Sequence, residues 1–262
     1  MAIIRRSVSE MDYYKQQIFP PHKLFLARLF GRMTGSRSLQ RDVNRPIDPK
    51  TIRKILVLDH QCIGDVLMLE PALHALRTHF KDAELHLLCV PAIKSLAEMA
   101  DLAHKVFAYP HENPFDMYYD MIINFHGDVR HIRLMRKFRA QYICGFSFSG
   151  GERYLSHVAD YPYRKHQVER PFELLSIMGV PVERKVPHLN LFHSSDEGKG
   201  IVLHPGAEHP ARRWPISHWK ELIRLLASKG MGITWIQPPG ENVPDGIPAL
   251  SGDLYKIAAG IS

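Results

Sequence analysis

Residues 55–76 have the sequence ILVLDHQCIGDVLMLEPALHAL and decide the fold of the chain. The four apolar residues at 55–58 are stopped by polar residues, a pattern typical of a buried parallel strand. After a turn that ends at Gly64, apolar residues recur at helical spacing. Because Pro71 cannot sit deep inside one continuous helix, we expect a short helix after Gly64 and a kink or restart near Glu70. Together these parts make the first half of a βαβ unit.

Asp65 follows the flexible Gly64 and lies at the start of the expected helix. In parallel sheets of this kind, ligands bind at the carboxyl ends of the strands, which is where this carboxylate lies. The local pattern leaves two interpretations open. Asp65 is either a first-turn acid favoured by the helix dipole or a general base at the mouth of a cleft.

The chain on either side of this stretch alternates short apolar runs with helical patterns. Further strands are expected at residues 84–90, 105–108, 120–125 and 142–145, and helices at 92–100, 128–138 and 167–178. A second alternation has strands at 200–203 and 232–236, a helix from 214 to 226, and a third unit that begins at 249. Alternating strands and helices predict an α/β fold with a doubly wound parallel sheet.

The composition of the segments predicts the domain organisation. We expect an N-terminal extension over 1–50, a first α/β domain over 51–180, a linker over 181–199 and a partial second domain over 200–262. The linker is predicted because it is rich in Pro, Ser and charged residues. The second domain is expected to be partial because doubly wound nucleotide-binding domains usually have about five or six strands.

Overall composition is that of an ordinary globular protein, with 45% hydrophobic and 23% charged residues among 262. No apolar run is long enough to span a bilayer, and the N-terminus lacks a signal-peptide pattern. Cys62, Cys89 and Cys144 lie far apart. They fit buried thiols in a reducing cytoplasm better than disulfides or a zinc site.

The positive charge of the chain is concentrated at its N-terminus. Residues 1–54 hold 12 Lys and Arg against 4 Asp and Glu, whereas the remaining residues hold 22 against 23. Within this segment, residues 22–33 (HKLFLARLFGRM) place apolar side chains on one helical face. This segment either lies on an anionic membrane surface as a basic amphipathic helix or packs against its own protein.

Two stretches together carry a family resemblance. The first begins at Ile55 and contains Gly-Asp-Val-Leu and Pro-Ala-Leu; the second, residues 201–226, is IVLHPGAEHPARRWPISHWKELIRLL, followed by PPGE. The chain from about Ile52 to Ser262 resembles the ADP-heptose:lipopolysaccharide heptosyltransferases of glycosyltransferase family 9. The intervening INFHGDVR, residues 123–130, also looks like the family's strand that ends in a polar–Gly element.

The resemblance implies two Rossmann-like domains of the GT-B type, the second of them incomplete in this chain. It implies that a lipid A–core acceptor binds the first domain and that ADP-heptose, or a related nucleotide sugar, binds the second. The implied reaction inverts the anomeric centre without a metal or other cofactor, and no Asp-x-Asp motif occurs in the sequence. The implied location is cytoplasmic, peripheral at the inner face of the inner membrane, with no nucleic-acid partner.

The resemblance also assigns roles to individual residues. Asp65 matches the family's catalytic aspartate, which takes the proton from the attacking acceptor hydroxyl. Arg212 stands where the family usually has Lys, and its charge would balance the diphosphate leaving group. The residues implied in donor binding are Gly64, His204, Pro205, Gly206, Ala207, Arg213 and Glu241. From the residues alone, the two arginines can also be a solvated loop pair, and Glu241 an exposed loop acid.

Arg130, Arg133 and Arg136 follow the INFHG turn at roughly helical spacing. They would bind phosphates of an anionic lipopolysaccharide core, or form a solvated basic face of a helix. Trp214 and Trp219 are expected to pack in the core rather than to contact a ligand.

One departure from the family keeps other functions open. Family members continue to an Asp-(Ser/Thr)-Gly-x-x-His element that binds donor phosphates and sugar, and this sequence has no such element up to Ser262. The rival hypotheses are a truncated, non-catalytic relative that binds lipopolysaccharide or membrane, and a glycosyltransferase that uses another nucleotide sugar. Binding of nucleotide sugars separates the enzyme from the binding module.

Overall fold

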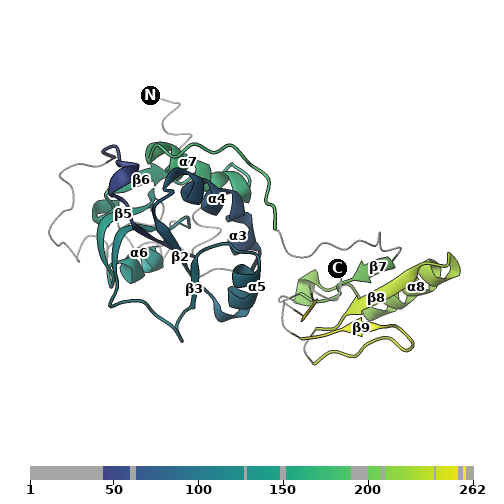
Figure 1. Cartoon of the computed structure of the whole chain (residues 1–262). Helices are drawn as coiled ribbons and strands as arrows, with labels where there is room; N and C mark the ends of the chain where they lie inside the picture. Colours follow the sequence, from purple (N-terminus) through teal and green to yellow (C-terminus); the bar gives the residue numbers. More distant parts are fainter. Residues whose placement is uncertain are drawn as a thin grey trace. The chain divides into compact units, whose positions relative to one another are not determined.

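The computed structural model describes residues 44–59, 63–126, 129–147, 152–189, 200–207, 210–238, 240–252 and 256–257. The chain divides into two compact units, which we call the N-terminal unit (Met1–Leu189) and the C-terminal unit (Asn190–Ser262). Figure 1 shows the helices and strands of both units. The amphipathic stretch 22–33 lies outside the described residues.

A parallel sheet forms the centre of the N-terminal unit, with the strand order β3-β2-β1-β4-β5-β6. The strands are β1 (Lys54–Leu58), β2 (Glu84–Cys89), β3 (Lys105–Ala108), β4 (Tyr118–Ile123), β5 (Arg139–Ser147) and β6 (His157–Asp160). The predicted α/β class is confirmed. The order reverses between β1 and β4, and the carboxyl ends of these two strands therefore form the topological switch point, where such sheets bind ligands.

Helices follow the strands of this sheet. They are α3 (Ile63–Met68), α4 (Glu70–His79), α5 (Lys94–Met99), α6 (Val129–Met135) and α7 (Arg170–Ile177), with short 3-10 helices at Pro49–Thr51, Pro91–Ile93, Glu152–Tyr154 and Gln167–Glu169. The predicted restart near Glu70 is confirmed, because α3 ends at Met68 and α4 begins at Glu70. Pro71 lies in the first turn of α4, where its missing N–H costs no helical hydrogen bond.

Several boundaries in the N-terminal unit differ from the prediction, and one strand was not predicted. Helix α6 ends at Met135 rather than at Phe138, and β5 begins earlier, at Arg139. The first residues of β5 alternate between exposed and half-buried, so they lack the apolar run that marks a buried strand. The unpredicted strand β6 has only four residues, HVAD, of which one is charged.

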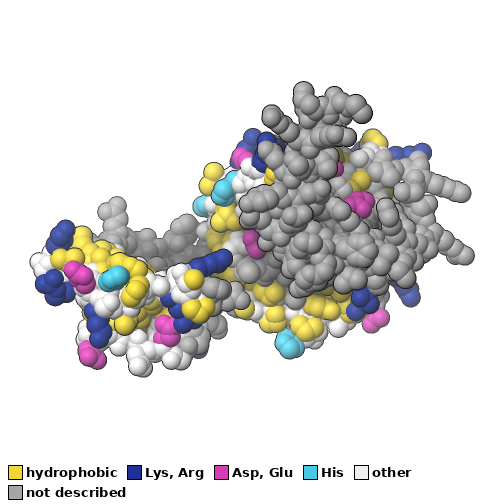
Figure 2. Space-filling model, turned by 180° about the vertical axis from the view of Figure 1, so that it is seen from behind, with side chains coloured by type: hydrophobic (Ala, Val, Ile, Leu, Met, Phe, Trp, Pro, Cys, Tyr) yellow, Lys and Arg dark blue, Asp and Glu magenta, His cyan; other side chains and the backbone are white. Residues whose placement is uncertain are grey.

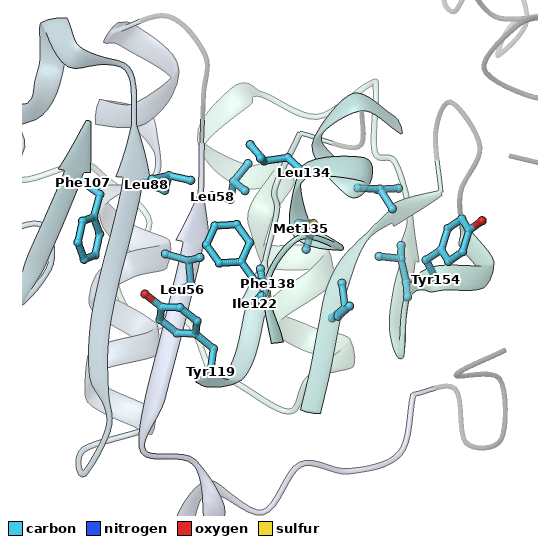
Figure 3. Packing of buried hydrophobic residues seen from close by; sticks show 13 residues of the cluster. Leu56, Leu58, Leu88, Phe107, Tyr119, Ile122, Leu134, Met135, Phe138 and Tyr154 are labelled. Carbon is cyan, nitrogen blue, oxygen red and sulfur yellow. The ribbon is translucent and has the colours of Figure 1, made fainter. Parts of the chain in front are cut away.

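The core on one face of the sheet is built around β1 and α6. Leu56 and Leu58 of β1 pack in one cluster with Met135 of α6 and with Phe138 (Figure 3). The ring of Tyr119 in β4 lies edge-on to Phe138, with 6.1 Å between centroids. Burying a side chain of this size contributes about 1.5–3 kcal/mol, so this packing holds the end of β1 firmly in place.

The cysteines of the N-terminal unit are buried free thiols where the structure describes them, as predicted for Cys89 and Cys144. Burial, together with the nearby Asp59 carboxylate, raises the pKa of Cys89 to about 12, and burial also raises the pKa of Cys144. Both therefore stay protonated at neutral pH. Cys62 lies outside the described residues.

The C-terminal unit contains a parallel sheet in the order β7-β8-β9, made of β7 (Gly200–Leu203), β8 (Gly232–Ile236) and β9 (Ala249–Leu250). A 3-10 helix at Pro210–Arg212 and α8 (Ile216–Ser228) connect β7 with β8. The predicted first two strands and the helix between them are confirmed. The helix expected from Asp253 falls largely outside the described residues.

Helix α8 covers the small core of this unit. Leu203, Ile233 and Trp235 are buried, and Trp219 of α8 packs against them as predicted. The prediction that Trp214 packs in the core was wrong, because Trp214 is 47% exposed, although its ring meets the Trp219 ring edge-on. Trp214 lies two residues before the start of α8, outside the helix that covers the core.

Hydrophobic side chains also lie on the surface of the C-terminal unit (Figure 2). Those with large exposed fractions are Val202, Trp214, Ile216, Leu225 and Met231. Val202 lies within β7, so one face of the sheet is open among the described residues. Among the described residues of both units, no helix is long and apolar enough to cross a membrane.

Candidate functional site

Asp65 lies in the first turn of α3, just beyond the end of β1. Its side chain is half-buried, and the residues described by the structure give it no hydrogen-bond or ion-pair partner. Gly64 beside it is exposed, and a Cβ there would meet no atom within 4 Å. The carboxylate is therefore both a first-turn acid and a group free to accept a proton, so the two interpretations do not exclude each other.

Asn124 completes the switch point from the side of β4. It is 1% exposed, and its Nδ2 donates to the Leu58 carbonyl at 2.7 Å. Its Oδ1 accepts from the backbone N–H of His126 at 3.2 Å. The ring of His126 lies 5.3 Å from that of His131, which belongs to α6. These polar residues join the ends of β1 and β4 to α6.

Asn124, His126 and His131 were not predicted as site residues. The available signal was the INFHG element, because a polar residue closes an apolar strand there. Asn124 reaches across to Leu58, which lies 66 positions away in sequence. Only the strand order brings these two residues together, and a single strand pattern does not give that order.

The three arginines proposed to meet the acceptor are placed in and after α6. Arg130 and Arg133 belong to the helix, and Arg136 follows its last residue. The side chains of Arg133 and Arg136 are exposed, and the Arg136 guanidinium lies over the Tyr154 ring at 4.2 Å. The cation–π contact orients the Arg136 guanidinium.

In the C-terminal unit, three of the residues expected to bind the donor lie together. The Arg213 Nε donates to the Ala207 carbonyl at 2.8 Å, and its Nη1 lies 3.0 Å from Glu241 Oε1. Ala207 follows β7 and Glu241 follows β8, so Arg213 links the loops at the carboxyl ends of both strands. The Glu241 loop is held further by Gln237, whose Nε2 donates to the Glu241 carbonyl at 2.8 Å.

The adjacent Arg212 has different surroundings. It ends the 3-10 helix Pro210–Arg212 with its side chain exposed, and the described residues provide it with no ion-pair or hydrogen-bond partner. Arg213 is committed to Ala207 and Glu241, whereas the charge of Arg212 is available to an incoming anion. The two arginines of this loop are therefore not equivalent.

The His204–Ala207 loop approaches the loop after β8 closely. Pro205 is buried and His204 is exposed. A Cβ at Gly206 would lie 3.1 Å from the Cγ of Pro238 and 3.2 Å from the Nε2 of His204. A side chain here would require Pro238 or His204 to shift by a few tenths of an ångström, so glycine suits this close approach.

The described residues contain no group of three or more His, Cys, Asp and Glu side chains that could hold a metal ion. Asp65 and Asn124 belong to the N-terminal unit, and Arg212, Arg213 and Glu241 to the C-terminal unit.

Comparison with known proteins identifies this architecture. Residues 116–243, which run from the strand before Asn124 through Glu241, match the model of glycosyltransferase family 9 (heptosyltransferase). This part of the chain is thus similar to the family 9 glycosyltransferases. The resemblance found in the sequence is thus confirmed, and the chain is related to glycosyltransferases of the heptose type. A comparison with curated protein sequences found no match.

Solved structures share the fold of this chain. Escherichia coli heptosyltransferase WaaC with ADP-2-deoxy-2-fluoro heptose is 18% identical, with 79% of each chain covered and a TM-score of 0.66. A family 9 glycosyl transferase from Veillonella parvula is 15% identical over 83% of this chain and 74% of its own, with a TM-score of 0.68.

The E. coli ADP-heptose lipopolysaccharide heptosyltransferase II is 16% identical over 78% of this chain and 75% of its own, with a TM-score of 0.60. At these identities the likeness is one of fold. It confirms the predicted class, an α/β protein with two Rossmann-like units of the GT-B type.

Proposed function

We propose that this family 9 protein transfers heptose from ADP-heptose to the inner core of lipopolysaccharide, with a lipid A–core saccharide as the acceptor. The observation that carries the proposal is Asp65, a half-buried carboxylate without a partner among the described residues, at the switch point of the N-terminal sheet. Its position and its freedom to take a proton support the role of general base.

The proposed reaction is a single displacement at the anomeric carbon. Asp65 removes the proton of the acceptor hydroxyl while the oxygen of that hydroxyl attacks the anomeric carbon of the heptose. The bond from that carbon to the diphosphate oxygen breaks, its electrons leave with ADP, and the configuration inverts. The exposed Arg212 balances the charge that develops on the departing diphosphate, and no metal cofactor is required.

The C-terminal unit would hold the donor through the two loops that Arg213 links. Gly206 lets the backbone of its loop approach the nucleotide closely. Glu241 binds Arg213 through Oε1, and its Oε2 would accept a ribose hydroxyl. The remaining donor contacts proposed are Gly64, His204, Pro205 and Ala207.

The acceptor would bind the N-terminal unit. Arg130, Arg133 and Arg136, in and after α6, are proposed to bind phosphates of the lipopolysaccharide core. The protein would act at the cytoplasmic face of the inner membrane, with the basic segment 22–33 on the anionic surface.

A transfer assay with a donor panel tests the proposal. The protein is incubated with a lipid A–core acceptor and with ADP-heptose, ADP-glucose or UDP-glucose in turn, and mass spectrometry detects acceptor that has gained one sugar. We expect addition of one heptose from ADP-heptose only. Transfer from another donor would change the substrate assignment, and absence of transfer from every nucleotide sugar would favour a non-catalytic lipopolysaccharide-binding relative.

A further inference from the structure

The hydrogen-bond ladder between β1 and β4 ends where the two strands reach the switch point. Its last register pair is Val57 with Ile123. Beyond it each strand pairs outward, because the N–H of Asp59 donates to Leu88 in β2 and the N–H of Asn124 donates to Cys144 in β5, both at 3.0 Å. The main-chain pairing of the two central strands thus ends here, and any bridge between them beyond this point must come from side chains.

The Asn124 side chain supplies that bridge. Its Nδ2 donates to the Leu58 carbonyl at 2.7 Å, in place of a main-chain donor of β4. The orientation of the amide is fixed, because the Leu58 oxygen can only accept and the His126 N–H can only donate. Exchanging the amide oxygen and nitrogen would break both contacts. At 1% exposure, the amide is sealed from water that could replace these bonds.

A third contact extends the bridge to α6. Asn124 Nδ2 lies 3.4 Å from Nδ1 of His131, and His131 is itself buried, with 8% exposure. The amide can only donate to this nitrogen, so the contact needs the neutral imidazole with its proton on Nε2. One buried amide therefore touches the end of β1, the turn after β4 and the first turns of α6.

These three elements carry the groups that the proposed reaction needs. The end of β1 leads into α3 with Asp65, and α6 carries two of the arginines proposed to bind the acceptor. An acceptor whose phosphates are bound at α6 must also bring its hydroxyl to the Asp65 carboxylate. A misplacement of about 1 Å can cost about a hundredfold in rate.

We propose that Asn124 is a positioning residue for the transfer reaction, which fixes the segment bearing Asp65 relative to α6 through Leu58, His126 and His131. Asn124 itself touches no substrate. The proposal rests on the proposed function, and it concerns how the base and the acceptor-binding helix keep their spacing during the reaction.

The substitution Asn124→Asp tests the role with nearly unchanged shape. The aspartate keeps an oxygen for the His126 N–H but turns a second oxygen toward the Leu58 carbonyl, which repels it. Tyr119→Phe is the matched control, because Tyr119 lies at the opposite end of the same strand. It loses the contacts of its hydroxyl with His86 Nδ1 at 3.0 Å and with Met117 Sδ at 3.6 Å. We expect kcat to fall about 10- to 100-fold in Asn124→Asp, with the donor KM within twofold of wild type and with wild-type kcat in the control.

An equal kcat in the two variants would overturn the proposal. If Asn124→Asp fails to fold, Asn124→Ala replaces it in the same comparison, since it removes the amide without adding a charge. A wild-type protein that transfers no sugar would refute the proposed function, and hydrogen exchange then tests the positioning alone. Amides of Ile63–Met68 and Val129–Met135 should exchange at least about fivefold faster in the Asn124 variant than in Tyr119→Phe; equal rates in the two variants would contradict the bridge.

Discussion

Two adjacent arginines of the C-terminal unit should contribute to the reaction in different ways. Arg213 is held by Ala207 and Glu241, whereas Arg212 has an exposed side chain and no partner among the described residues. A cation aimed at developing charge lowers the barrier, so Arg212→Ala should reduce kcat about 100- to 1,000-fold without unfolding the unit. Arg213→Ala should chiefly raise the donor KM, because it releases the loops. Steady-state kinetics with ADP-heptose measures kcat and the donor KM of both variants. The same changes in kcat and KM in both variants would refute the different roles of the two arginines.

His157 should make the stability of the N-terminal unit depend on pH. Burial lowers the pKa of His157, although the hydrogen bond from its Nε2 to the Arg45 carbonyl at 2.6 Å opposes this effect. As pH falls through about 6.5, the ordinary histidine pKa, the unfolded chain takes up a proton that the folded chain does not. The unfolded state then binds more protons, so the free energy of unfolding decreases as pH falls.

Replacing His157 by Gln keeps a donor for the Arg45 carbonyl and removes the titration. We expect His157→Gln to lose less stability than wild type between pH 7.5 and pH 5.5, in urea unfolding followed by circular dichroism. Part of the dependence should remain, because burial also lowers the pKa of His86. The exposed His111→Gln is the control and should behave as wild type. Equal losses in all three proteins would contradict the assignment.

At the scale of elements, the start of α4 fixes the segment that leaves the N-terminal unit. Glu70 is 7% exposed, and its Oε1 binds the guanidinium of Arg184. Its Oε2 accepts from the backbone N–H of His188 at 2.8 Å. This segment precedes the passage into the C-terminal unit, and α4 directly follows the helix that bears Asp65.

Neutralising this carboxylate should loosen the segment. Glu70→Gln should lower the free energy of unfolding by about 1–3 kcal/mol, because hydrogen bonds to a charged group are lost and Arg184 stays partly buried. Limited proteolysis should then cut within residues 181–189 faster than in wild type. Glu98→Gln is the control, since Glu98 is half-exposed and pairs with Lys94 only at 3.8 Å. Wild-type cleavage rates in Glu70→Gln would show that the contact does not hold the segment.

The sequence predicts the elements better than the contacts between them. The restart at Glu70 was predictable because Pro71 acts locally, through its own ring and missing N–H. The bonds of Asn124 to Leu58 and of Arg213 to Glu241 were not predictable in this way. Each joins residues on different βα units, so it depends on the order of strands in the sheet. Strand β6 was missed because its four residues show no apolar run.

At the scale of the whole molecule, the two units divide the proposed work. The base and the acceptor arginines belong to the N-terminal unit, and the donor residues to the C-terminal unit, apart from Gly64. All three tryptophans, Trp214, Trp219 and Trp235, also belong to the C-terminal unit. Tryptophan emission therefore reports on the proposed donor-binding unit alone, and Trp214 directly follows Arg212 and Arg213.

The most direct test of the account measures donor binding and sugar transfer together in Asp65→Asn. ADP-heptose is titrated against tryptophan emission, and transfer to the lipid A–core acceptor is followed in the same preparation. We predict a donor Kd within about twofold of wild type and a kcat reduced about 100- to 10,000-fold, because only the general base is lost. Transfer at the wild-type rate would contradict the role of Asp65 and the proposed mechanism with it.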